Sequence, residues 1–148
     1  MTETAPFADV GLQLAQMRAA APLVHNITNF VAMNVMANIE LAVGASPAML
    51  HGLPEVTEFA ALCNALSVNI GTADANWAEA MVQAARVMRR LDRPWVLDPV
   101  GIGATQFRKD LCARLLDLRP TVIRANASEI LALAGLGGQA HGVDARDT

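Results

Sequence analysis

The chain has 148 residues, a formal net charge of -3, 53% hydrophobic residues and only 17% charged residues. This length suits one domain with a sizeable core, and the scattered charges exclude a basic patch for a phosphate backbone, so we expect no nucleic-acid partner. The apolar surplus over an ordinary domain predicts either a large subunit interface or a core whose other side lies outside this chain.

Short apolar runs alternate with longer helical patterns, which is typical of βαβ units around a mainly parallel sheet. A first helix is predicted at residues 6–20. Strands are predicted at residues 23–25, 46–50, 66–70, 95–98 and 121–124, each followed by a helix. The fold class is therefore α/β, with a mainly parallel sheet flanked by helices. We expect one domain over residues 1–148, stopping after about five βα units and incomplete at its carboxyl-terminal side.

Three further helices have apolar residues at steps of three and four, the spacing that places them on one face. The clearest runs over residues 76–91, and its predicted core stripe consists of Trp77, Met81, Ala84, Met88 and Leu91. The other two cover residues 30–43 and 107–118, the latter with Leu111, Leu115 and Leu118 on its core face. The tail over residues 135–148 is rich in Gly, Asp and small residues, which predicts a loop.

Residues 19–39 contain no Asp, Glu, Lys or Arg, a run long enough to raise the question of a transmembrane helix. Pro22, His25 and four asparagines interrupt it, and unpaired amides are costly in hydrocarbon, so we predict a segment buried in protein and no membrane partner. Cys63 and Cys112 lie in apolar segments without Cys-x-x-Cys spacing, and no secretory signal is evident. A reducing cytoplasm is the expected location.

Polar residues after the predicted strands are the first candidates for a site, because open α/β sheets bind ligands at the carboxyl ends of their strands. Asn29 ends the amide-rich run at residues 25–29, where its side chain either caps the next helix or binds a neutral polar ligand. Met49 lies near the end of the second predicted strand, where a methionine is more often a core residue than a ligand contact.

Two later segments combine charge with a strand end. Asp98 directly follows an apolar strand, where burying a carboxylate costs free energy unless it binds a cation or caps a turn. The Pro-Val-Gly-Ile-Gly run that follows favours a metal or phosphate role. Asn126 and Glu129 have the spacing of a helix capping box. Arg124 ends the strand beside that helix N-terminus, which suits a phosphate, and both interpretations can hold together.

Other common sites are not supported by the sequence. His51 and His141 have no partners at metal-ligand spacing, so no zinc site is expected. The chain has no Gly-x-x-x-x-Gly-Lys-[Ser/Thr] pattern, so any use of ATP would not involve a P-loop.

Five motifs in register make the sequence resemble the hydroxyethylthiazole kinase family from residue 22 to residue 135. They are PLVHNITN at 22–29, GASPAM at 44–49, NIGT at 69–72, LDPVGIGAT at 97–105 and RANASE at 124–129. The resemblance implies a ribokinase-like fold. It also implies transfer of the ATP γ-phosphate to the hydroxyl of 4-methyl-5-(2-hydroxyethyl)thiazole in thiamine biosynthesis and salvage, by a homotrimer with sites between subunits.

The resemblance also implies roles for individual residues. Asn29 and Met49 should contact the thiazole, Met49 through its backbone; Arg124 should bind ATP phosphates; and Asp98 and Glu129 should help to hold Mg²⁺, directly or through water. Two departures are Asn26, where many relatives have Cys, and Ala125, where many have Gly.

No catalytic residue is expected in this chain. The family's Gly-rich anion-hole turn and reactive cysteine are expected beyond it, and neither Cys63 nor Cys112 lies in such a turn. One alternative is therefore an inactive truncated remnant that keeps part of the thiazole pocket and the oligomer interface, since losing an anion hole can remove most of a rate. Another is a ribokinase-like kinase that acts on a pyrimidine alcohol.

Overall fold

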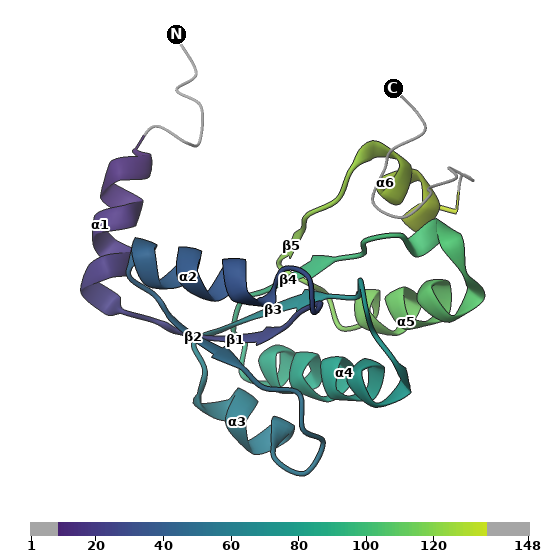
Figure 1. Ribbon diagram of the computed structural model, residues 1–148, viewed down its shortest axis with the longest axis horizontal. Coiled ribbons are helices and arrows are strands. Elements are labelled where there is room, and N and C mark those ends of the chain that lie inside the picture. The colour runs from purple at the N-terminus through teal and green to yellow at the C-terminus, as the bar shows by residue number, and fades with distance from the viewer. Residues whose placement is uncertain (1–8, 136–148) are drawn as a thin grey trace, which may run out of the picture.

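The computed structural model describes residues 9–135, which form a five-stranded, fully parallel sheet with helices on both faces (Figure 1). The strands are β1 (Leu23–Ile27), β2 (Ser46–Met49), β3 (Ala65–Asn69), β4 (Trp95–Asp98) and β5 (Val122–Ile123). Their order across the sheet is β2-β1-β3-β4-β5. Because all strands are parallel, their carboxyl ends share one edge, and the predicted α/β fold class is confirmed.

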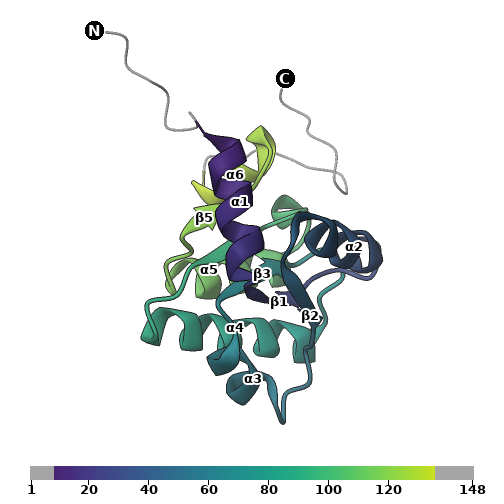
Figure 2. The same cartoon turned by 90° about the vertical axis from the view of Figure 1, so that its left-hand side faces the viewer.

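A helix follows each strand, as predicted. The helices are α1 (Val10–Ala20), α2 (Met33–Val43), α3 (Val56–Leu62), α4 (Ala75–Arg90), α5 (Gln106–Leu116) and α6 (Ala127–Leu133), with a short 3-10 turn η1 (Ile102–Ala104) after β4. Side-chain caps fix several of their starts: the Asp74 carboxylate accepts from the Trp77 N–H to begin α4. Figures 1 and 2 show α3, α4 and α5 below the sheet and α2 above it, with α1 beside α2.

The hydrophobic core lies between the sheet and the layer formed by α3, α4 and α5. Four members of the predicted α4 stripe are buried, and so is the predicted core face of α5: Trp77, Met81, Ala84, Met88, Leu111, Leu115 and Leu118. Leu91 was predicted wrongly, because α4 ends at Arg90 and Leu91 is its C-cap, 39% exposed. Periodicity alone does not show where a helix stops.

The opposite face of the sheet is thinly covered. Neither α1 nor α2 contains a buried residue. Their exposed large apolar side chains are Val10, Leu12, Val35, Ile39 and Leu41. The prediction that residues 19–39 are buried therefore holds at β1, where His25–Ile27 are buried, but is wrong for α2. The reason is that α2 is packed on its sheet side only, with no further described layer outside it.

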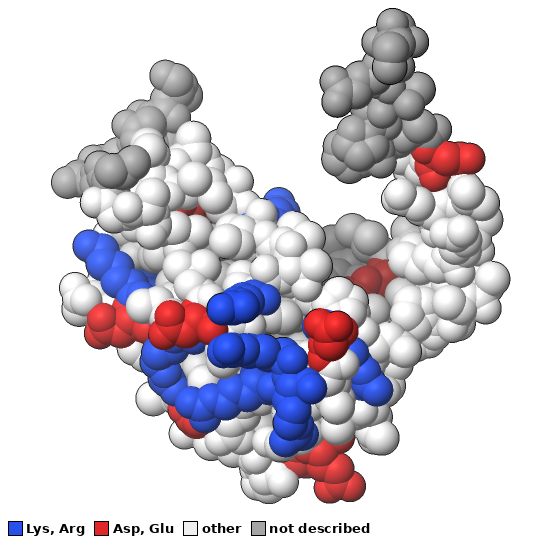
Figure 3. Space-filling view, turned by 180° about the vertical axis from the view of Figure 1, so that it is seen from behind, with Lys and Arg blue, Asp and Glu red and all other residues white. Residues whose placement is uncertain are grey.

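Charged side chains are unevenly distributed over the surface. Seen from behind, charged side chains gather over the part of the molecule where α4 and α5 lie, whereas the arm formed by α1 is nearly free of them (Figure 3). At the far edge of the sheet, Val122 of β5 is 51% exposed. Apolar surface is therefore open along α1, α2 and the β5 edge, in line with the apolar surplus of the sequence.

Predicted element boundaries differ from the structure by a few residues. The helix expected at 30–43 begins at Met33, because residues 29–32 form a turn that the Asn29 side chain closes. The helix expected at 6–20 begins at Val10, capped by Asp9, and residues 6–8 lie outside the described part. The predicted tail loop falls on undescribed residues after 135. No helix within residues 9–135 is long and apolar enough to cross a membrane.

Candidate functional site

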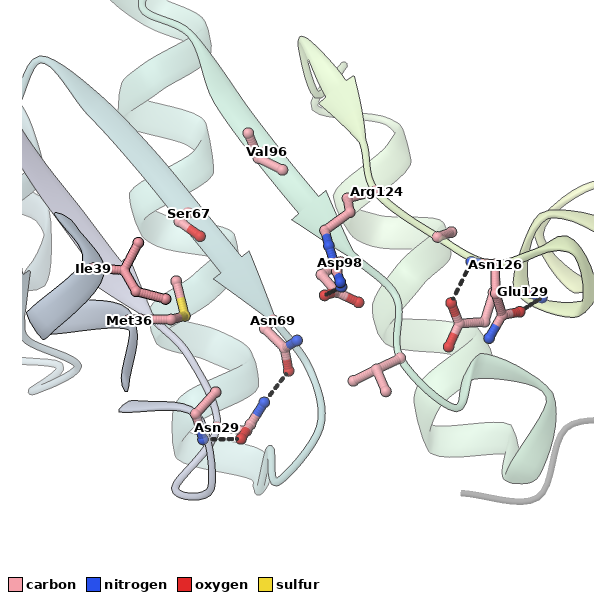
Figure 4. A pocket seen from close by; sticks show the side chains of 13 residues that line it. Asn29, Met36, Ile39, Ser67, Asn69, Val96, Asp98, Arg124, Asn126 and Glu129 are labelled. Atoms are coloured by element: carbon pink, nitrogen blue, oxygen red, sulfur yellow. Dashed lines mark hydrogen bonds and ion pairs between the residues drawn. The ribbon is translucent and has the colours of Figure 1, made fainter. Parts of the chain in front are cut away.

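A hollow of about 830 Å³ opens at the carboxyl ends of β3 and β4, beside α2 (Figure 4). Four of the five predicted site residues line it: Asn29, Asp98, Arg124 and Glu129. These come from two loops, the end of β4 and α6, so the parallel topology brings together residues that are up to 100 positions apart in the sequence. Met49 does not line this hollow.

The hollow has an apolar wall and a polar floor. Ala32, Met36 and Ile39 of the α2 segment form the wall. Asn69 and Asp98 lie on the floor, where they are register partners on β3 and β4 and so share one face of the sheet. A ligand that is part apolar ring and part polar chain matches this division.

Two amides of the floor form a directed chain of hydrogen bonds. The Ala32 N–H donates to Asn29 Oδ1 at 2.8 Å, and Asn29 Nδ2 donates to Asn69 Oδ1 at 2.8 Å. The Gly71 N–H donates to the same Asn69 oxygen at 2.9 Å. A backbone N–H can only donate, so both amide orientations are fixed. Asn29 thus closes the turn before α2, whose N-cap is Ala32, and it also lines the hollow.

Gly71 leaves room for the two amides of this arrangement. A Cβ at residue 71 would lie 3.0 Å from Asn69 Oδ1 and 3.1 Å from Asn29 Cβ, closer than such contacts normally allow. Asn69 was not among the predicted site residues, although a polar residue at the end of β3 is the signal that could have identified it.

Asp98 and Arg124 form an ion pair at the far end of the floor. Arg124 Nη1 donates to Asp98 Oδ2 at 2.7 Å; the arginine side chain is 79% exposed and the aspartate side chain 14%. The guanidinium therefore lies at the rim, where an anion can reach it, and the carboxylate lies inside. Asp98 Oδ1 has no hydrogen-bond partner among residues 9–135 and can accept from a ligand or bind a cation.

Both carboxylate oxygens of Glu129 accept hydrogen bonds from backbone N–H groups. Its Oε2 accepts from the Asn126 N–H at 2.9 Å and its Oε1 from the Gly101 N–H at 3.1 Å, and the residue is 4% exposed. The predicted capping box is confirmed. The second contact ties α6 to the loop after β4, so Glu129 holds the part of the backbone that surrounds Asp98.

Arg108 of α5 joins the loops that border the hollow, and no pattern in the sequence singled it out. Its guanidinium donates to the carbonyls of Ile70 at 3.1 Å, Gly71 at 2.6 Å and Val100 at 2.8 Å. A smaller hollow of about 480 Å³ lies beside it and shares Asn29 with the larger one. Arg108 thereby fixes the β3 loop, which positions Asn69 and Gly71, against the β4 loop.

Two further polar residues of β1 lie apart from the hollow and on opposite faces of the sheet: Asn26 contacts Glu40 of α2, whereas His25 packs against Phe59 of α3. Asn26 Nδ2 donates to Glu40 Oε2 at 3.1 Å, while Asn26 Oδ1 is buried and has no hydrogen-bond partner among the described residues. His25 Nε2 donates to the Leu50 carbonyl at 2.7 Å. Burial lowers the pKa of His25, partly opposed by that hydrogen bond, and burial raises the pKa of Glu40. Asn26, the departure noted in the sequence, therefore does not contact the hollow directly; its register partner on the edge strand is Met49.

Comparisons with known proteins agree with these features. The sequence model of the hydroxyethylthiazole kinase family matches residues 14–148. A hydroxyethylthiazole kinase of Cereibacter sphaeroides (strain ATCC 17025) is 59% identical over 138 residues, and one of Rhizobium rhizogenes (strain K84) is 54% identical over 142 residues. These matches cover 93% and 96% of this chain but 53% of each relative. The chain therefore spans about half the length of the curated relatives it matches.

A solved structure is also similar. The hydroxyethylthiazole kinase protein from Pyrococcus horikoshii OT3 superposes with a TM-score of 0.79 at 48% sequence identity, over 82% of this chain and 48% of that one. The sheet and helices described above are thus those of a solved hydroxyethylthiazole kinase over the matched part.

Proposed function

Because this chain belongs to the hydroxyethylthiazole kinase family, we propose that it serves the ATP-dependent phosphorylation of the hydroxyl of 4-methyl-5-(2-hydroxyethyl)thiazole, in thiamine biosynthesis and salvage. The observation that supports this most directly is the division of the hollow: an apolar wall, an amide floor, and an Asp98–Arg124 pair at one end. The reaction forms a bond between the alcohol oxygen and the γ-phosphorus, breaks the bond to the bridging oxygen of ATP, and releases the hydroxyl proton.

The alcohol belongs at the amide end of the hollow. Its methylated ring can pack on Met36 and Ile39, which removes apolar surface from water. We propose that Asn29 contacts the ring where it meets the floor, the role that the family resemblance implies. A neutral ring needs no charged partner, and the α2 wall contributes none to the hollow.

The ATP phosphates belong at the Asp98–Arg124 end. Arg124 is exposed enough to turn from Asp98 to a phosphate, and a guanidinium binds phosphate oxygens in a bidentate manner. Phosphoryl transfer depends mainly on positioning and on neutralising charge, so this contact contributes to both.

Mg²⁺ fits Asp98 but not Glu129 as a direct ligand. Residues 9–135 hold no group of three or more His, Cys, Asp or Glu side chains around one point. Mg²⁺ commonly keeps several waters and binds through one or two carboxylates plus substrate phosphates, a role for which Asp98 Oδ1 is free. Both Glu129 oxygens accept from backbone N–H groups, so we propose that Glu129 reaches the ion only through water. When bound, the ion would neutralise phosphate charge.

We further propose that the protein is a homotrimer, with α1 and α2 in the subunit contact. Their uncovered apolar side chains, among them Val35 at 57% and Leu41 at 60% exposed, support a partner on this face. Met49 ends the edge strand β2, outside the hollow, so we propose that its contact with the thiazole is completed only in the assembled trimer. The buried free thiols Cys63 and Cys112 suit a cytoplasmic protein.

A second candidate function is binding of the alcohol without catalysis. The described hollow provides amides, one free carboxylate oxygen and one guanidinium, all of which bind and position. We propose that the catalytic groups, as expected from the sequence, are not among the residues of this chain, and that its own part of the reaction is to bind both substrates.

One assay separates the two candidates. The purified 148-residue chain is incubated with the thiazole alcohol, ATP and Mg²⁺, and the product is measured by mass; a pyrimidine alcohol is added as competitor. Product that disappears in Asp98→Ala but persists in the control Asp110→Ala, an exposed α5 residue outside the hollow, supports the kinase. Binding of the alcohol by folded chain without product supports the binding role. Competition by the pyrimidine would contradict the thiazole assignment.

A further inference from the structure

The Asn69 amide has a donor that the fold leaves unused. Its Oδ1 accepts from the Gly71 N–H at 2.9 Å and from Asn29 Nδ2 at 2.8 Å. The first of these donors is a backbone N–H, so the oxygen must face it and Nδ2 must face the other way. Among residues 9–135, Asn69 Nδ2 has no hydrogen-bond partner. In Figure 4 this nitrogen points away from Asn29, on the side of Asp98.

The place of this donor along the floor of the hollow defines what it can meet. Asn69 lies between Asn29, at the amide end, and Asp98, its register partner on β4, at the phosphate end. In the proposed function the ring lies at the first end and the phosphates at the second. The atom of the alcohol between its ring and the transferred phosphoryl group is the hydroxyl oxygen.

On the basis of the proposed function, we propose that Asn69 is a specificity-determining residue that donates its Nδ2 hydrogen bond to the hydroxyl oxygen of the alcohol substrate. A hydroxyl oxygen has two lone pairs, so it can accept from Asn69 through one and still attack phosphorus with the other. Adjacent strands lie about 4.8 Å apart, so side chains at register positions on β3 and β4 can both reach one ligand oxygen at about 2.9 Å.

The surrounding contacts pre-organise this donor. The hydrogen-bond chain from Ala32 through Asn29 fixes one side of the Asn69 oxygen, and the Gly71 N–H fixes the other. Arg108 in turn holds the Gly71 carbonyl at 2.6 Å. A donor held in place before the ligand arrives loses little rotamer entropy on binding, so its contact contributes more fully to affinity.

The structure supplies a variant that separates donation from support. Asn69→Asp keeps an oxygen that can accept from Gly71 and Asn29 but removes the donor, whereas Asn69→Ala removes both. Asn64→Asp is the matched control: Asn64 Oδ1 also accepts from a backbone N–H, that of Leu23 at 2.8 Å, but Asn64 does not line the hollow. The thiazole alcohol is neutral, so an added negative charge does not simply repel it.

The experiment is calorimetric titration of each full 148-residue chain with the thiazole alcohol, with 4-methyl-5-ethylthiazole, which lacks the hydroxyl, and with ATP. We expect both Asn69 variants to bind the alcohol about five- to tenfold more weakly, the loss of one hydrogen bond, and Asn64→Asp to bind it like the unchanged chain. We expect the ethyl analogue to bind equally to the unchanged chain and to Asn69→Asp. Circular dichroism confirms that each variant is folded.

Three outcomes would overturn the proposal. If Asn69→Asp binds the alcohol normally and only Asn69→Ala fails, then Asn69 merely supports the loop. If Asn69→Asp weakens the alcohol and the ethyl analogue equally, its effect is on pocket shape and not on the hydroxyl. If Asn69→Ala weakens ATP but leaves the alcohol unchanged, the donor serves a phosphate. Absence of alcohol binding by the folded, unchanged chain would instead refute the proposed function, and the Asn69 role with it.

Discussion

Replacing Arg108 with methionine should destabilise the protein far more than an exposed ion pair would suggest. The guanidinium donates to three main-chain carbonyls, those of Ile70, Gly71 and Val100, at 3.1, 2.6 and 2.8 Å. Hydrogen bonds to charged groups each contribute about 1.5–3 kcal/mol when measured singly. Because the three share one side chain and water can partly replace them at the molecular surface, we expect a total loss of about 3 kcal/mol.

The loss is measured by urea unfolding of the 148-residue chain, followed by circular dichroism. With a denaturant slope of about 2 kcal/mol per molar urea, a 3 kcal/mol loss lowers the midpoint by about 1.5 M. Arg108→Lys should retain part of the stability that Arg108→Met loses, since an ammonium group cannot reproduce the planar set of donors of a guanidinium.

Arg114→Met is the matched control, because Arg114 lies on the same helix and its ion pair with Glu79 is 46% and 37% exposed. The Arg114→Met substitution should lower the free energy of unfolding by less than about 1 kcal/mol. If Arg108→Met costs no more than Arg114→Met, Arg108 does not hold the two loops together and the reasoning is wrong.

Four further predictions use the same chain. Burial lowers the pKa of His25 from its ordinary 6.5, so around that pH the folded state binds fewer protons than the unfolded state. The free energy of unfolding should therefore fall as the pH drops from about 7.5 to about 5.5. Urea titrations of His25→Gln should show a weaker dependence on pH over this range. Burial raises the pKa of Glu40 above 4.5, so its ionisation opposes folding as pH rises; Glu40→Gln should stabilise the fold at neutral pH by less than about 1 kcal/mol, and destabilisation would contradict this. Cys63 and Cys112 are fully buried, and burial raises the pKa of Cys112 to about 12. A thiol reagent should therefore label neither cysteine until urea unfolds the chain. Rapid labelling of the native protein would show that the reagent reaches the core. Arg124→Ala should change stability by less than about 1 kcal/mol but weaken ATP binding about tenfold while sparing the thiazole alcohol, and equal loss of both ligands would count against the phosphate role.

Much of the fold could be predicted because its helices and strands depend on patterns of residues that are close together in the sequence. The strand at residues 95–98 is predicted with its observed bounds, and the core stripes of α4 and α5 follow from helical spacing. The capping box of Asn126 and Glu129 is likewise local, since both partners lie within one turn. Leu91 marks the limit of such patterns, because the end of a helix depends on what the next residues contact.

The candidate site could be predicted in part. Asn29, Asp98, Arg124 and Glu129 each lie at or after the carboxyl end of a strand. Parallel strands present these ends at one edge, so a pattern of polar residues there predicts that they meet. It does not show what each side chain contacts there. The commitment of both Glu129 oxygens to backbone N–H groups, and the position of Met49 outside the hollow, are visible only once the loops are placed.

The sequence by itself determined the element order, the α/β class, the family and four of the residues that line the hollow, because these depend on spacing along the chain. Only the tertiary structure decided the direction of the Asn29–Asn69 amide chain and the three carbonyl contacts of Arg108. The physical reason is that hydrogen-bond direction depends on which donor and acceptor meet in space, and the groups concerned lie up to 40 residues apart in the sequence.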